Sequence, residues 1–172
     1  MLFRSSHKLN EEKYIKAVAR LWKGFKEKDL QKIYSKIELN PNVKVILRQL
    51  KNIKIKLVLV SNIPTKLGEL YKNLGFDYVF GTECEIKNGI FTGKVLKMNS
   101  DKGDVVGNLC NKIGIRLNES IAVGDARGDI KMFKIIGYDN SIAYNATDEV
   151  NQYTKYPIKD FTEIIEIIKK IK

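Results

Sequence analysis

The chain has 172 residues, and 31 Lys and Arg against 20 Asp and Glu give it a formal net charge of +11. With 44% hydrophobic and 30% charged residues, the composition is typical of one globular domain and excludes disorder over most of the chain. No apolar run approaches the roughly 18 residues of a membrane span, so a membrane protein is excluded. Because the Lys residues are spread along every segment, we interpret the charge as a solvated surface and expect no nucleic-acid partner.

The termini and the cysteines indicate a reduced, cytoplasmic protein. The N-terminus lacks the apolar length of a signal peptide. Cys84 and Cys110 show no CxxC spacing, and His7 is the one His of the sequence, so we expect neither a zinc site nor a disulfide.

The first fifty residues predict helices. Apolar residues recur at helical spacing over residues 14–25, behind a predicted N-cap at Asn10, and again over residues 30–37. Pro41 predicts the start of a third helix, which continues to Leu50.

From residue 55 the pattern changes to strands that alternate with helices. Strands are predicted over residues 55–60, 77–80, 120–123 and 141–144, a hairpin over residues 84–92, and helices over residues 65–74, 102–113, 129–136 and 160–171. Asn88-Gly89 favours a type I′ turn in the hairpin. The alternation predicts an α/β fold in which an open, mostly parallel sheet carries helices on both faces. Ligands of such sheets bind beyond the carboxyl ends of the strands.

Three polar groups lie at those ends. Ser61 and Asn62 follow the first predicted strand, where a hydroxyl and backbone N–H groups can hold an anion. Lys102 opens a helix, a position that disfavours a cation unless an anion lies nearby. Asp125 and Asp129 follow the strand over residues 120–123, and carboxylates there suit Mg²⁺. Each group taken alone also has a structural interpretation, as turn residues, helix surface or an N-cap.

The combination of these groups resembles a known family. The segments are Leu-Val-Leu-Val-Ser-Asn at residues 57–62, Asn-Gly-Ile-Phe-Thr-Gly-Lys-Val at residues 88–95, Lys-Gly-Asp at residues 102–104, and the stretch from Ala122 to Phe133. In this order they resemble the haloacid dehalogenase (HAD) superfamily, specifically its phosphoserine phosphatase-like branch. The resemblance covers nearly the whole chain. It implies a partial helical cap over residues 1–40 and a Rossmann-like α/β core over residues 41–172.

The resemblance also implies a reaction: Mg²⁺-dependent hydrolysis of a small phosphorylated metabolite through an aspartyl phosphate. By resemblance, Ser61 binds the phosphate through its hydroxyl, with the Asn62 backbone beside it. Lys102 neutralises the nucleophile and the phosphoryl group. Asp125 ligates Mg²⁺, and Asp129 orients Lys102 or the waters of the metal. The substrate stays open, because Val18 stands where phosphoserine phosphatases carry an Arg that binds the substrate carboxylate.

One motif of the family has no counterpart. The Asp-x-Asp-x-Thr motif, which supplies the nucleophile and follows the first core strand, should precede Ser61, and Asp29 in a helical stretch is the one Asp there. One hypothesis is therefore a phosphatase that lost its first strand and is inactive as this chain. A second is a catalytically dead relative that binds a phosphorylated ligand or a partner protein. A third is a missing strand supplied by another chain, and unpaired sheet edges also favour a homodimer.

Overall fold

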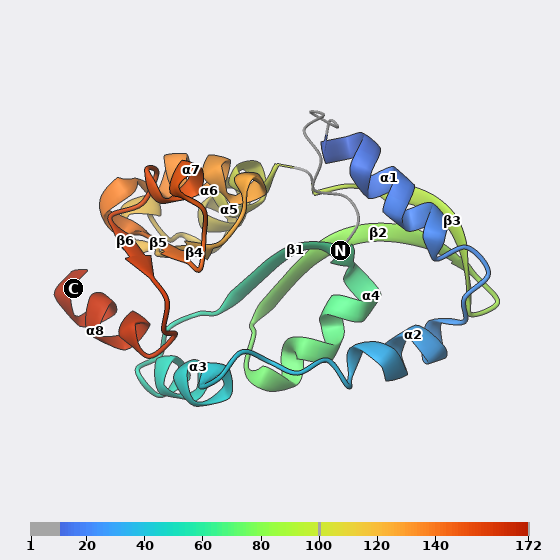
Figure 1. Ribbon diagram of the computed structural model, residues 1–172, viewed down its shortest axis with the longest axis horizontal. Coiled ribbons are helices and arrows are strands. Elements are labelled where there is room, and N and C mark those ends of the chain that lie inside the picture. The colour runs from blue at the N-terminus through green and yellow to red at the C-terminus, as the bar shows by residue number, and fades with distance from the viewer. Residues whose placement is uncertain (1–10, 100, 172) are drawn as a thin grey trace.

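The computed structural model describes residues 11–99 and 101–171 (Figure 1). The helices are α1 (Glu11–Leu21), α2 (Glu27–Tyr34), α3 (Val43–Asn52), α4 (Thr65–Gly68), α5 (Lys102–Ile113), α6 (Ile130–Ile136), α7 (Asp148–Asn151) and α8 (Glu163–Ile171). The strands are β1 (Val58–Pro64), β2 (Tyr78–Lys87), β3 (Ile90–Lys97), β4 (Ala122–Gly124), β5 (Ser141–Tyr144) and β6 (Tyr156–Ile158). Short 3-10 helices are η1 (Glu69–Leu74), η2 (Leu117–Glu119), η3 (Arg127–Asp129) and η4 (Tyr138–Asn140). No helix of the described residues is long and apolar enough to cross a membrane.

The strands form two three-stranded sheets, in the orders β1-β2-β3 and β4-β5-β6. Strand β1 pairs in parallel with β2, which turns back into β3, and β4, β5 and β6 are all parallel. The α/β class and the mostly parallel pairing expected from the sequence are confirmed. Over residues 11–99 and 101–171 no strand lies between β1 and β4, so each of these is an edge strand.

Helices cover both faces of the β4–β6 sheet. Alternate residues of β5 point to opposite faces, so neighbouring residues contact different helices. Ile142 packs in one cluster with α3 and α8. Its neighbour Ser141 points to the other face, where its hydroxyl donates to the carbonyl of Gly137 at the end of α6 (2.7 Å). Figure 1 shows α3 and α8 below this sheet and α5, α6 and α7 above it.

One of three buried clusters reaches from the residue before β1 to the β4–β6 sheet. Leu57, immediately before β1, belongs to the same buried cluster as Ile142 of β5 and Ile158 of β6. Buried residues of α3 and α8 complete the cluster, and these two helices contact each other. The layer formed by α3 and α8 therefore reaches from β1 to the β4–β6 sheet.

The N-terminal helices are fastened to the β2–β3 hairpin. Helix α1 packs on β3, and the turn after it exchanges backbone hydrogen bonds with Phe91, through Gly24 N–H to Phe91 O (2.9 Å) and Phe91 N–H to Phe25 O (2.9 Å). A buried cluster of Leu30, Leu67 and Phe91 joins α2, α4 and β3.

Several expected boundaries change in the structure. The third helix begins at Val43 and not at Pro41, because Asn42 takes a left-handed conformation (φ 67°) just before it. The strand expected over residues 77–80 and the first arm of the hairpin are one continuous strand, β2. Strand β6 and helix α7 were not predicted, since β6 contains a Pro and both elements are short. The predicted N-cap Asn10 lies outside the described residues.

The expected turns are present. Asn88 (φ 50°) and Gly89 (φ 74°) both have the positive φ that a type I′ turn needs. Gly75 (φ 103°) and Gly114 (φ 70°) end η1 and α5 in the left-handed conformation.

Cys84 and Cys110 are free thiols, and burial raises the pKa of Cys84 to about 11.

Candidate active site

Ser61 and Asn62 lie in an irregular part of β1. Regular pairing with β2 runs from Val58 to Val60 and resumes at Pro64, which opposes Thr82. The intervening residues form a bulge, a feature that bends a strand and redirects its side chains. The Ser61 hydroxyl accepts a hydrogen bond from the Ile63 N–H (3.3 Å). The bulge therefore fixes the position of the Ser61 oxygen.

Gly81 of β2 allows this bulge to approach closely. A Cβ atom at Gly81 would lie 2.5 Å from the Ile63 carbonyl oxygen and 2.9 Å from the backbone nitrogen of Thr65. Such distances are sterically forbidden, so only Gly fits here. The Thr82 hydroxyl donates to the Asn62 carbonyl (2.9 Å) and holds the bulge from the same strand.

Asn99 connects this end of β1 to the start of α5. Its side-chain amide donates to the Gly81 carbonyl (2.7 Å), three residues before Lys102 begins the helix. Helix α5 also contacts β1 itself and η3. The first turn of α5 is thus held between the carboxyl ends of the two sheets.

Lys102 and Asp129 form a buried ion pair at this junction. Lys102 Nζ lies 2.6 Å from Asp129 Oδ1, and the side chains are only 14% and 5% exposed. No other ion pair among the described residues has both side chains so deeply buried. Asp129 thereby compensates the cation that the sequence places at a helix start.

The second oxygen of Asp129 is held by the loop after β4. Asp129 Oδ2 accepts hydrogen bonds from the backbone N–H groups of Asp125 and Ala126 (both 3.0 Å). A Cβ at Gly124 would lie 2.5 Å from the Asp129 carboxyl carbon, so Gly124 is required for this approach. The Asp129 side chain makes no capping bond to α6, which argues against the N-cap interpretation.

A second ion pair ties the start of α5 to α6. Asp101, the N-cap of α5, accepts a hydrogen bond from the Asp104 N–H (3.1 Å) and forms an ion pair with Lys131 of α6. The Lys131 ammonium group holds the pKa of Asp101 below its ordinary value. Gly103 packs on the backbone of Lys131, where a Cβ would lie 3.1 Å from the carbonyl oxygen. These contacts, which the sequence analysis missed, fix the start of α5 against α6.

Asp125 is the residue of this site that fits a metal ion. Its side chain is exposed, whereas both Asp129 oxygens already accept protein hydrogen bonds. Residues 11–99 and 101–171 contain no group of three or more His, Cys, Asp or Glu that could enclose a metal. Since Mg²⁺ takes one or two carboxylates and keeps several waters, Asp125 suits one position of its shell.

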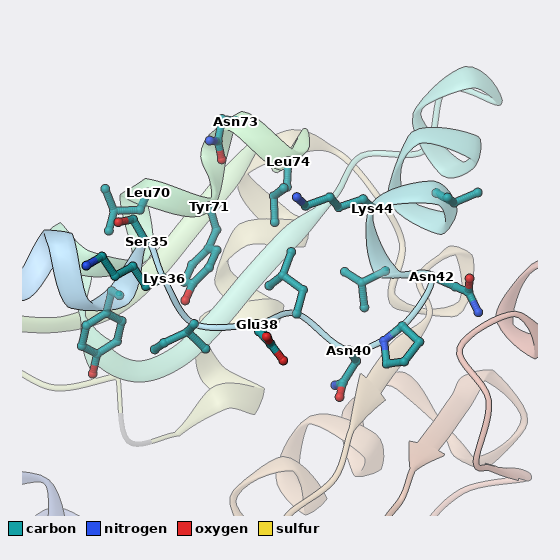
Figure 2. A pocket seen from close by; sticks show the side chains of 16 residues that line it. Ser35, Lys36, Glu38, Asn40, Asn42, Lys44, Leu70, Tyr71, Asn73 and Leu74 are labelled. Atoms are coloured by element: carbon teal, nitrogen blue, oxygen red, sulfur yellow. The ribbon is translucent and has the colours of Figure 1, made fainter.

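The structure thus brings Lys102, Asp125 and Asp129 together, and α5 and Asn99 connect them to the bulge that carries Ser61 and Asn62. None of these five residues lines the cavity of about 670 Å³ that lies elsewhere in the chain. Figure 2 shows that side chains of η1, of the segment between α2 and α3, and of the start of α3 surround that cavity. A second cavity, of about 620 Å³ beside α5, is also lined by other residues.

Comparison with known proteins identifies the family and the fold. The sequence model of the haloacid dehalogenase-like hydrolase family matches residues 1–134. The chain belongs to this family. Its relatives include the phosphoserine phosphatase of Methanocaldococcus jannaschii, which is 30% identical over 169 residues, or 94% of this chain and 79% of that protein. The phosphoserine phosphatase of Archaeoglobus fulgidus is 36% identical over 133 residues. These relatives place the chain in the phosphoserine phosphatase-like branch.

Solved structures agree with this placement. A phosphoserine phosphatase described as a phospho-aspartyl intermediate analogue has a TM-score of 0.80 and 28% identity, with 96% of this chain and 79% of that chain covered. A substrate-bound phosphoserine phosphatase has a TM-score of 0.81 and 27% identity. The alignment with the Archaeoglobus relative covers 75% of this chain but only 38% of that relative's length.

Proposed function

We propose that this chain forms the phosphate-binding and cation-binding part of a phosphomonoester hydrolase site that acts on a small phosphorylated metabolite. The observation that carries the proposal is the buried pair of Lys102 and Asp129. Its position where β4 ends and α5 begins, beside the bulge of β1, is where an α/β sheet binds its ligands.

Each residue has a role that its contacts support. The Ser61 hydroxyl, whose oxygen is held by the Ile63 N–H, donates its proton to a phosphate oxygen. Lys102 gives one N–H to Asp129 and keeps two for the phosphoryl group. Asp129 keeps the ammonium group in place, since its other oxygen is anchored on backbone N–H groups of the β4 loop. The Asn62 backbone completes the phosphate side of the site.

The local charge supports a divalent cation. Asp101, Asp125 and Asp129 outnumber the two ammonium groups of Lys102 and Lys131, so a phosphate dianion meets excess negative charge. Mg²⁺ bound through Asp125 would neutralise that charge and the charge on the transferring oxygens. Phosphate binding is therefore expected to depend on Mg²⁺.

The reaction class requires a nucleophile in addition to the groups that bind the phosphate. In the covalent route suggested by the phospho-aspartyl relative, an Asp oxygen forms a bond to phosphorus as the ester P–O bond breaks. The leaving alkoxide takes a proton, and water then cleaves the acyl phosphate. The described aspartates of this site are Asp101, Asp125 and Asp129, and each has another role: Asp101 caps α5 and pairs with Lys131, Asp129 holds Lys102, and Asp125 is the candidate metal ligand. We therefore infer that this chain alone does not turn over.

A second candidate function is phosphate-ligand binding without chemistry. It is favoured by the two Asp129 oxygens, which are both engaged in holding the site together, so that Asp129 is not free to act as a nucleophile. Both candidate functions predict that the chain binds phosphate. Only the first predicts hydrolysis once a nucleophile is supplied.

Binding of inorganic phosphate in the presence of Mg²⁺ tests the shared part of the proposal. Calorimetry should show Lys102→Met weakening phosphate binding at least about tenfold, because the cation that meets the anion is lost. Lys112→Met, on the exposed end of the same helix, is the matched control and should leave binding unchanged. Equal phosphate affinity of the two variants would contradict the proposal.

A turnover assay tests the inference that this chain alone does not hydrolyse a phosphomonoester. The 172-residue chain with Mg²⁺ should release no phosphate from para-nitrophenyl phosphate above the buffer blank. Turnover that is abolished by Asp125→Asn would contradict this expectation and reveal a nucleophile outside the proposed set.

A further inference from the structure

The cavity of about 670 Å³ between η1, the α2–α3 segment and the start of α3 has an apolar lining (Figure 2). The aliphatic side chains around it are those of Ile37, Leu39, Val43, Val45, Leu70 and Leu74. Most of them are half-buried, and Ile37 and Val45 are 51% and 44% exposed. Small-molecule sites are typically hollows of about 300–1,000 Å³ with such a lining. The size and the lining of this cavity therefore suit a small ligand.

The cavity separates two buried clusters. Tyr34, at the end of α2, packs against the cluster that joins α2, α4 and β3. Val43 and Leu74 pack against the cluster to which α3 and α8 contribute. Helices α2 and α3 therefore rest on different clusters, and a ligand in the cavity would contact residues that belong to both.

The segment that crosses the cavity is held by side-chain packing. Within the described part of the chain, Glu38 and Leu39 form no hydrogen bond. Asn40 and Asn42 accept backbone hydrogen bonds only from the start of α3. The segment can therefore adjust around a ligand without losing a hydrogen bond.

The charges around the cavity favour an anion. Lys36 and Lys44 line it, and neither forms an ion pair with a described residue. Lys44 extends toward Leu74, whereas the carboxylate of Glu38, the one acidic residue of the lining, is directed away from Lys44 (Figure 2). The first turn of α3 contains no acidic residue. A ligand with a negative charge would thus supply the partner that Lys44 lacks.

We propose that this cavity binds a small amphipathic carboxylate, with its anionic group at Lys44 and its apolar body against Leu74, Tyr71 and the α2–α3 segment. The proposal does not rest on the proposed function, since Lys102 and Asp129 lie outside the lining. Because the ligand contacts both clusters, its binding stabilises the folded chain.

The lining favours a small molecule over a polypeptide. It consists of helix ends and a connecting segment, and no strand of the described residues belongs to it, so an extended chain would find no edge with which to pair. A second copy of the chain is disfavoured by the net charge of +11.

Titration with 3-phenylpropanoate tests the proposal on the full 172-residue chain, with the backbone amide signals followed by NMR. We expect saturable shift changes in residues 35–44 and 70–74, with a dissociation constant below about 5 mM, and none at Lys102 or Asp129. The uncharged 3-phenylpropanamide has nearly the same shape. It should bind at least about fivefold more weakly, because Lys44 then meets no anion.

Two variants of α3 separate the site from the general charge of the chain. Lys44→Met should weaken binding of 3-phenylpropanoate at least about fivefold and bring the acid and the amide to similar affinities. Arg48→Met is the matched control, because Arg48 is exposed one turn further along α3 and lies outside the lining. It should bind the acid as the parent does. Circular dichroism establishes that both variants fold.

Thermal unfolding gives a second readout. At one concentration of 3-phenylpropanoate, the melting temperature should rise for the parent and for Arg48→Met, and rise less for Lys44→Met. The absence of saturable binding, equal affinity of the acid and the amide, equal losses in the two variants, or shift changes centred on Lys102 would each overturn the proposal. So would a dimer that buries the same amides.

The outcomes for this cavity and for the proposed function are distinguishable. Lys44→Met should leave the binding of inorganic phosphate with Mg²⁺ unchanged. Phosphate binding without binding of 3-phenylpropanoate would overturn the carboxylate site and leave the proposed function standing. Binding of 3-phenylpropanoate without phosphate binding would do the reverse.

Discussion

The two sheets differ in how they are stabilised. The β4–β6 sheet is made of short parallel strands, and in β5 Ser141, Ile142 and Ala143 are all buried between helix layers. The β1–β3 sheet is longer and more open, and half-buried residues fill β1. The compact sheet supplies Asp125 and Asp129, whereas the open sheet supplies Ser61. The difference shows that the site depends on the junction of the two, where α5 brings Lys102.

Replacing a buried Phe beside each of the two sheets should have the largest effect on stability. Phe133 of α6 is 0% exposed and Phe91 of β3 is 1% exposed. Phe133→Ala and Phe91→Ala should each lower the free energy of unfolding by about 3–5 kcal/mol, because each leaves a cavity. Phe133 and Phe91 belong to separate buried clusters, but the cluster of Leu57 and Ile142 and the contacts of α5 with β1 and α6 couple the two sheets. Both variants should therefore shift a single transition in urea denaturation.

Two separate transitions, one lowered by each variant, would show that the sheets unfold independently. That result would contradict the coupling of the two sheets, and the site at their junction would then not depend on cooperative folding of the whole chain.

Gly81 tests the close approach that shapes the open sheet at the site. Gly81→Val should lower the free energy of unfolding by about 2–3 kcal/mol, because its Cβ meets the Ile63 carbonyl and the Thr65 backbone. Gly107→Ala in α5 is the control, since the nearest atom to its Cβ is Ile135 Cδ1 at 3.8 Å. That variant should be neutral or stabilising by up to about 1 kcal/mol in thermal or urea unfolding.

Replacing Asp77, the residue before β2, should have a smaller effect on stability, and this effect should depend on pH. Its carboxylate accepts hydrogen bonds from Lys51 Nζ (2.7 Å) and from the Leu57 N–H (2.7 Å), which ties α3 and the start of β1 to β2. Partial burial acts to raise the pKa of Asp77, but the bonds from Lys51 and Leu57 outweigh it and lower the pKa. Asp77→Ala should cost about 1.5–2 kcal/mol at pH 7.

The sign of the pH dependence follows from the lowered pKa. The contribution of Asp77 is complete above its unfolded pKa of about 3.9 and disappears as the pH falls through the lower folded value. The difference in urea unfolding between the parent and the variant should therefore shrink as the pH falls below about 4. Asp139→Ala, which removes the exposed partner of Lys155, should change stability by less than about 1 kcal/mol and serves as the control. A difference in stability between the parent and Asp77→Ala that does not narrow as the pH falls below about 4 would contradict this account.

Local chemistry made much of the fold predictable. The Asn88-Gly89 turn, the glycine helix end at Gly114 and the period of α5 depend on neighbouring residues, and the structure has them as expected. The bulge after Val60 was not predictable, because it depends on Gly81, which is twenty residues away and packs against it in space.

The site was predictable only in part for the same reason. Lys102 and Asp129 were selected because each lies at the end of a strand or the start of a helix, and they meet across 27 positions of sequence. The supporting pair of Asp101 and Lys131 gave no signal, since charged residues at helix starts are common.

A crystal structure of the chain grown with Mg²⁺ and inorganic phosphate tests the central claim most directly. The account predicts phosphate between the Ser61 hydroxyl and Lys102 Nζ, with the Lys102–Asp129 pair retained and the ion on Asp125. Phosphate bound elsewhere, or a Lys102 side chain turned away from a phosphate at this junction, would contradict it.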